Sequence, residues 1–143
     1  MKEQIKSFED LKCWQALREV RNYTSGIIKK LPYEENKALK DQMRRSSRSI
    51  TENVAEGYGR FHYGENIQFC RISRGSLYEL TDQYITCMDE KFITQEKYKQ
   101  IRGIIDTAMS LLNGNINYLR KAKSQSNSPK TNMLKEDIVE YSL

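Results

Sequence analysis

Basic side chains recur at helical spacing along residues 37–48, and they are the groups in this chain best suited to binding phosphate. Lys37, Lys40, Arg44 and Arg48 are separated by three, four and four positions, so a helix would place them on one face. Asp41 interrupts this face, and a solvated charged surface is the alternative interpretation. Because clustered Lys and Arg are typical of nucleic-acid-binding surfaces, we predict phosphate contacts. The predicted contact residues are Lys37, Lys40, Arg44, Arg45, Arg48 and Arg60.

Groups suited to catalysis or metal binding are few. Glu52 and Glu56 lie four positions apart, a spacing that can serve acid/base chemistry, but no His or Asp nearby completes a site. The single histidine, His62, excludes a His-rich metal site, and the serines have no identifiable base. Three cysteines without CxxC spacing argue against a zinc site and a disulfide framework. We therefore expect no enzymatic activity, no cofactor and no metal.

The segment 57–64 combines three glycines with four rings and a cation. Its rings can stack on unpaired bases, or they can close one end of the fold, and the second interpretation is slightly favoured. The residues concerned are Tyr58, Arg60, Phe61, His62 and Tyr63.

Length and composition indicate a small helical domain. The chain has 143 residues, two prolines, seven glycines and a formal net charge of +5. So few turn-forming residues favour long helices, and the positive charge favours a polyanionic partner. The first twelve residues are rich in charge and do not resemble a signal peptide, so we expect a cytoplasmic protein with no contact to membranes.

Four segments show helical periodicity, at about residues 8–31, 34–56, 65–91 and 94–121. Ser7 and Thr94 are the expected N-caps, and Gly57 is the expected stop of the second helix. Small residues on the second and third segments, such as Ser49, Ser73 and Gly75, predict close packing of these two helices. The fold class is therefore all-α: an antiparallel up-down four-helix bundle over residues 1–123, with a polar linker and flexible tail at 124–143.

The third helical segment carries apolar residues on two faces, which suggests that it is covered on both. The first face, expected to pack inside the bundle, carries Phe69, Ile72, Ser73, Ser76, Leu80 and Cys87. Its second face mixes arginine, tyrosine and isoleucine, a composition that favours a homo-oligomer contact. An internal ion pair of Arg74 with Glu52, Glu56 or Glu79 is the alternative. The predicted interface residues are Ile67, Arg71, Arg74, Tyr78 and Ile85.

Four groups of residues along the chain form motifs that can be compared with known families. The most specific motif is Ser49-Ile50-Thr51-Glu52-Asn53-Val54-Ala55-Glu56-Gly57-Tyr58-Gly59-Arg60. The others are Phe8-Glu9-Asp10-Leu11 with Trp14-Gln15, Gln42-Met43-Arg44-Arg45-Ser46 after Pro32, and Ile72-Ser73-Arg74-Gly75-Ser76-Leu77-Tyr78-Glu79-Leu80 after Asn66 and Phe69. Together these motifs resemble the four helix bundle protein family, also called the 23S rRNA intervening-sequence protein family. The resemblance covers about residues 8–121, and Cys70 and Ser73 depart from it where Leu and Ala are expected.

The resemblance implies a small bacterial bundle that assembles as a ring-shaped homopentamer and has no established catalytic residues. The family is also similar to the accessory proteins of diversity-generating retroelements, basic pentamers that bind nucleic acid and a reverse transcriptase. We therefore expect a non-catalytic bundle that binds RNA or another nucleic acid. The alternative is a scaffold that docks a protein partner such as a reverse transcriptase.

Overall fold

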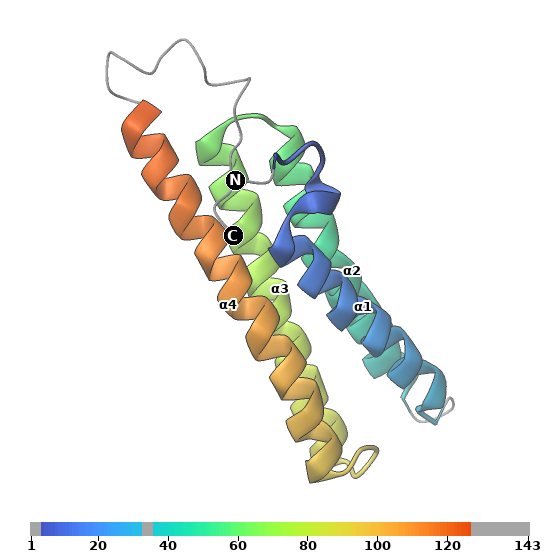
Figure 1. The fold of residues 1–143 in the computed structure, drawn as a ribbon. Helices are drawn as coiled ribbons and strands as arrows, with labels where there is room; N and C mark the ends of the chain where they lie inside the picture. Colours follow the sequence, from blue (N-terminus) through green and yellow to red (C-terminus); the bar gives the residue numbers. More distant parts are fainter. Residues whose placement is uncertain (1–3, 33–35, 127–143) are drawn as a thin grey trace.

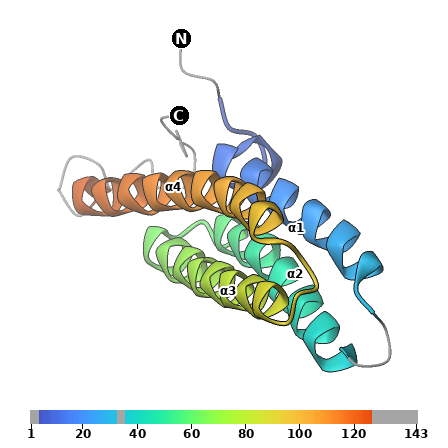
Figure 2. The same ribbon diagram turned by 90° about the horizontal axis from the view of Figure 1, so that it is seen from below.

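The computed structural model describes residues 4–32 and 36–126. Four α-helices pack along one another as a bundle: α1 (Lys12–Lys30), α2 (Lys37–Gly59), α3 (Tyr63–Asp89) and α4 (Gln95–Ser126) (Figure 1). Each helix packs against its sequence neighbours, and α1 also packs against α4, which closes the bundle (Figure 2). No strand occurs in the described part of the chain, so the all-α class is confirmed.

All four helices contribute to the core, and in α1 and α4 the buried residues follow the apolar seams that helical periodicity predicts. In α1 the seam runs from Cys13 through Leu17 and Val20 to Leu31, and all four residues are buried. Burying an aliphatic side chain of this size stabilises the fold by about 1.5–3 kcal/mol. The buried residues of α4 are Ile101, Ile105, Ala108, Leu112, Asn115, Ile116, Leu119 and Ser126.

The N-terminal turn differs from the predicted start of the first helix. Ser7 does form a capping box with Asp10, as expected of an N-cap, but it caps a short 3-10 turn, η1 (Phe8–Asp10). Leu11 then adopts an extended conformation and buries its side chain, so α1 begins only at Lys12. Phe8 meets Trp14 edge to face, with ring centroids 5.1 Å apart, and this turn covers the end of the bundle.

The predicted stop at Gly57 is wrong. Gly57 is helical and buried, and α2 continues to Gly59. A Cβ at Gly57 would stand 2.8 Å from the Phe69 Cβ, so glycine is needed there for the close approach of α3. The chain instead reverses at Phe61, whose φ of 55° is unusual for a bulky residue.

Helix α3 buries a stripe that is rotated from the predicted one. Ser73, Leu80 and Cys87 are buried as expected. Ile72, which was also expected to be buried, is 44% exposed, and Leu77 is buried instead. The periodicity is weak in α3 because its apolar residues are distributed over two faces, and the contacts with α2 and α4 decide which residues are buried.

Helix α4 begins and ends as its local sequence allows. The backbone N–H of Lys97 donates to the Thr94 Oγ1 at 3.0 Å, which confirms the N-cap. The helix extends to Ser126, three residues into the predicted linker, because no proline or glycine stops it and basic side chains suit the negative end of the helix dipole. The remainder of the predicted linker and tail lies outside the described residues. Among the described residues, no helix is both long and apolar enough to cross a membrane.

Candidate functional site

A groove of about 400 Å³ lies between α1 and α2, the blue and teal helices of Figure 1. Four of its lining side chains are cationic and none is a carboxylate. Such a surface holds a positive potential that nothing within the groove cancels. The lining residues are Arg21, Asn22, Ser25, Ile28, Lys29, Arg44, Ser47 and Arg48.

Two of the groove arginines are held by neighbouring side chains. The Arg21 Nη1 donates across the helix pair to the Thr51 Oγ1 at 3.2 Å. The Arg44 Nη1 donates to the Asp41 Oδ1 at 3.0 Å, but both side chains are more than 40% exposed, so this ion pair adds little stability. Each arginine therefore keeps N–H donors available for an anion.

The structure separates the six predicted phosphate contacts. Only Arg44 and Arg48 line the groove between α1 and α2. Lys37 begins α2 and is exposed, whereas Lys40 is only 9% exposed and belongs to the buried face of the helix. The predicted residues therefore do not form one continuous face.

Arg45 lies in a different environment, a polar groove between α2 and α3 that also contains Glu79 and Asp82. Serines from both helices line this groove, and the Ser49 and Ser76 hydroxyls are 2.7 Å apart. The two carboxylates lower the local potential, so this groove is less suited to phosphate. The other lining residues are Gln42, Ser46, Ser49, Ser76 and Gln83.

Arg60 is engaged by carboxylates at the end of the bundle. Its Nη2 donates to the Glu56 Oε1 at 2.7 Å, and its Nη1 lies 4.0 Å from the Glu65 Oε2. Its guanidinium also lies over the Phe69 ring, 5.3 Å from the centroid. One member of the acid/base pair considered above, Glu56, is therefore already in an ion pair with Arg60.

The aromatic residues of the predicted loop serve two purposes. Tyr58 and Tyr63 pack against the core and close the end of the bundle, which is one of the two interpretations of this segment. Phe61 is 53% exposed and His62 is exposed, so these two rings face solvent.

The predicted oligomer face is only partly free. Ile67 packs against the core, and the Arg74 Nη1 donates to the Asn113 Oδ1 of α4 at 3.0 Å, not to any of the three glutamates considered. Ile85 is half-buried. Tyr78 is 59% exposed and Arg71 is exposed. The centre of this face is therefore available for a contact.

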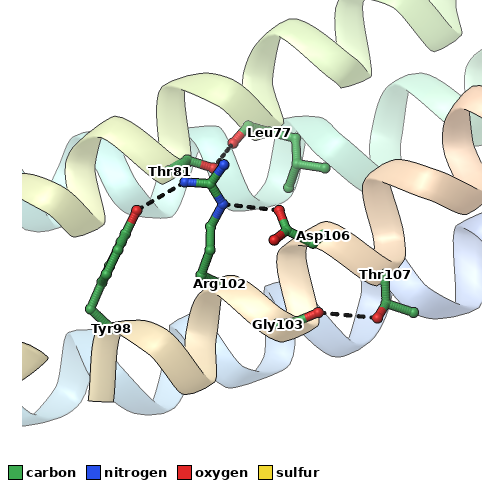
Figure 3. A network of polar contacts seen from close by, with 7 residues as sticks. All are labelled: Leu77, Thr81, Tyr98, Arg102, Gly103, Asp106 and Thr107. Atoms are coloured by element: carbon green, nitrogen blue, oxygen red, sulfur yellow. Dashed lines mark hydrogen bonds and ion pairs between the residues drawn. The ribbon is translucent and has the colours of Figure 1, made fainter. Parts of the chain in front are cut away.

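Arg102 on α4 is a cation whose charge is compensated by a neighbouring carboxylate. Its Nε donates to the Asp106 Oδ1 at 2.9 Å and its Nη1 to the Tyr98 hydroxyl at 3.0 Å (Figure 3). The bond to Asp106, then that to Tyr98, raises the pKa of Arg102. In the groove between α1 and α2, Arg44 pairs with Asp41 of its own helix, but among the described residues no carboxylate lines the groove itself.

The three cysteines are buried inside the bundle. Burial raises the pKa of Cys13 from 9.0 to about 12 and the pKa values of Cys70 and Cys87 to about 11. Thiols of this kind are poor nucleophiles at neutral pH. Within residues 4–32 and 36–126, no group of three or more His, Cys, Asp or Glu side chains could hold a metal ion.

Two groove residues, Arg21 and Lys29 of α1, are not among the predicted phosphate contacts. A local signal exists, because Arg21, Ser25 and Lys29 recur every four positions beside the buried seam. Their pairing with Arg44 and Arg48 depends on how α1 and α2 align, which the spacing within one helix does not reveal.

A family model described as 23S rRNA-intervening sequence protein matches residues 9–114. The chain belongs to this family. The match to the intervening-sequence protein model spans both walls of the groove and the exposed centre of α3. A comparison with curated proteins finds no match. Membership in the intervening-sequence protein family therefore confirms the resemblance, while the groove must be interpreted from its own chemistry.

Proposed function

We propose that this intervening-sequence protein is a non-catalytic, cytoplasmic bundle that binds RNA or another nucleic acid. The observation that carries the proposal is the groove between α1 and α2, which gathers four cations and no carboxylate. Binding phosphates there releases counterions from the nucleic acid, a driving force that does not depend on base sequence.

The proposal includes an up-down bundle that assembles as a ring-shaped homo-oligomer, a homopentamer by family resemblance. The alternation in direction is supported between α2 and α3, where Ser46 bonds Gln83 and Ser49 bonds Ser76. The exposed Tyr78 and Arg71 support a contact between copies through α3. Several linked grooves would bind one long polyanion more tightly than a single groove does.

The test is a fluorescence anisotropy titration of the protein with a labelled mixed-sequence RNA between 50 and 200 mM salt. Four phosphate contacts to a single strand predict that affinity falls on the order of fiftyfold over this range. In the variant R44A/R48A, two contacts remain and the fall is about sevenfold. The control R45A/R60A removes the same charge from cations that lie near carboxylates, and we expect it to bind like the wild type.

Absence of binding at 50 mM salt would overturn the proposal. The alternative, a scaffold that docks a protein such as a reverse transcriptase, is favoured by the same exposed centre of α3. It predicts that substitution of Tyr78 weakens protein binding while RNA is bound weakly or not at all.

A further inference from the structure

Arg21 crosses from α1 to α2 and is oriented there by Thr51. The Thr51 Oγ1 accepts a hydrogen bond from the Arg21 Nη1 at 3.2 Å and donates one to the Arg48 carbonyl oxygen at 3.2 Å. Thr51 itself is buried, so its position is fixed by packing. A guanidinium has five N–H donors, and this arrangement uses one of them. Arg21 is therefore a pre-oriented fork whose other donors are available for phosphate oxygens.

Both walls of the groove carry cations that can contact a ligand. Arg21 and Lys29 project from α1, and Arg44 and Arg48 from α2. From Arg21 to Lys29, eight helical steps cover about 12 Å. This length corresponds to about three to four nucleotides at the rise of about 3.4 Å per nucleotide that a strand has in B-DNA, and to fewer of a more extended single strand. The groove therefore offers at least one cation for each phosphate that it can hold.

The lining contains no aromatic ring and no carboxylate, and its other polar groups are two serines and one asparagine. Without a stacking platform, bases gain little from entering the groove. Contacts to phosphates position a strand without reading its sequence. A groove of about 400 Å³ is also too small for a duplex to enter.

We infer that the groove between α1 and α2 binds the sugar-phosphate backbone of a single nucleic-acid strand, with Arg21 as the phosphate fork and Thr51 as its positioning residue. This inference rests on the proposed function and specifies the ligand of the same site. Binding is independent of base sequence, and the bases point away from the protein.

The experiment compares three labelled probes by anisotropy: a 12-nucleotide oligo-U RNA, a mixed-sequence RNA of equal length, and its duplex. We expect equal affinity for the two single strands, within about twofold, and weaker binding of the duplex. Inorganic tripolyphosphate is the competitor that represents free oligophosphates. We expect it to displace RNA only at a large excess, because it spans too few of the cations.

Four variants test the role of Arg21. T51V removes the orienting hydroxyl without changing charge, and we expect about fivefold weaker binding with an unchanged salt slope. T51S keeps the hydroxyl and should bind like the wild type. R21A should lower the salt slope by about 0.7, whereas R21K should keep the slope and still bind more weakly. K99A, which removes an exposed cation on α4, is the charge-matched control for R21A.

The outcomes separate the inference from the proposed function. If the wild type binds RNA and T51V, R21K and R21A all bind it as tightly as the wild type does, the roles of Arg21 and Thr51 are overturned, whereas the proposed function, which R44A/R48A tests, stands. The inference would also be overturned if T51V and T51S weakened binding equally, or if the protein preferred one base sequence. The same holds if tripolyphosphate bound as tightly as RNA and displaced it without a large excess. Failure of the wild type to bind any RNA at 50 mM salt would overturn both.

Discussion

The Ser73 hydroxyl on α3 donates a 2.6 Å hydrogen bond to the Ile50 carbonyl oxygen on α2. Both residues are completely buried. The bond satisfies a hydroxyl that would otherwise be costly in the core, and the small side chain lets the two helix backbones come close. The predicted close packing of α2 and α3 is therefore confirmed at this position.

We expect S73A and S73V to differ. S73A removes one hydrogen bond, while the Ile50 carbonyl remains part of helix α2. The free energy of unfolding should therefore fall by about 1 kcal/mol. S73V adds volume between two tightly packed helices and should cost about 1–3 kcal/mol more. Denaturant unfolding, followed by circular dichroism, measures both values. Equal stability of the two variants would show that the helices are not closely packed at Ser73.

Two helical glycines should respond to alanine in opposite directions. A Cβ at Gly57 would lie 2.8 Å from the Phe69 Cβ, so G57A must push α3 away and should destabilise the protein by about 1–3 kcal/mol. A Cβ at Gly75 meets nothing within 4 Å, so G75A should stabilise it by up to about 1 kcal/mol through helix propensity. Thermal unfolding of the two variants gives the comparison. A loss of stability in G75A would contradict it.

Gly75 also shows where the sequence could mislead. Its place among the small residues of α3 suggested that it contacts α2, but it is exposed and faces open space. Gly57, expected to end a helix, is instead the contact glycine. In both cases the deciding information is the position of a neighbouring helix, which local spacing does not contain.

The parts of the fold that the sequence predicts well are those with one dominant apolar face. In α4, Ile101, Leu112 and Leu119 follow a regular seam and are all buried. In α3, apolar residues occupy two faces, and Ile72 was assigned to the wrong one. Half of the candidate site was predicted, for a similar reason. The spacing along α2 indicated Arg44 and Arg48, but the cations that α1 contributes to the groove depend on how the two helices align.

The backbone at Phe61 should be strained, although its side chain is exposed. Its φ of 55° lies in the left-handed region, which costs a side-chain-bearing residue about 1–2 kcal/mol. F61A keeps this cost and removes the ring, whereas F61G removes both. We expect F61G to be more stable than F61A by about 1 kcal/mol, since the greater freedom of glycine in the unfolded chain offsets part of the gain. Equal stability in urea unfolding would contradict a strained turn.

Raising the pH should destabilise the protein through its buried thiols. In the folded state, burial raises the pKa values of Cys70 and Cys87 from 9.0 to about 11, so the unfolded chain loses these protons first. The unfolded state then binds fewer protons than the folded state, and stability falls as pH rises. This contribution is fully present below pH 9 and is lost as pH rises from 9 to about 11.

Denaturant unfolding at several pH values tests this dependence, with the variant C70A/C87A as the control. The variant should start less stable, because it leaves cavities, but should lose less stability between pH 8 and pH 10.5. A thiol reagent such as DTNB should react with the folded protein at pH 8 only as fast as the protein opens. Immediate reaction of Cys70 or Cys87 in the folded protein would contradict their burial.

Tyr78 should decide whether copies of this chain associate through α3. Its ring is 59% exposed beside the exposed Arg71, and aromatic and arginine side chains are enriched in protein interfaces. A glutamate at this position would bring an unpaired charge into a buried contact, so we expect Y78E to weaken self-association at least tenfold, as measured by sedimentation velocity.

I72E is the matched control, because Ile72 is 44% exposed on the same helix and six positions away, on the other flank. We expect it to leave the association unchanged. If I72E dissociates the oligomer as strongly as Y78E, the interface covers the opposite flank of α3 as well, and the predicted interface is wrong in its extent. If the wild type sediments as a monomer at every concentration, the ring-shaped assembly is wrong. A single groove would then have to bind RNA without the gain in affinity that linked grooves provide.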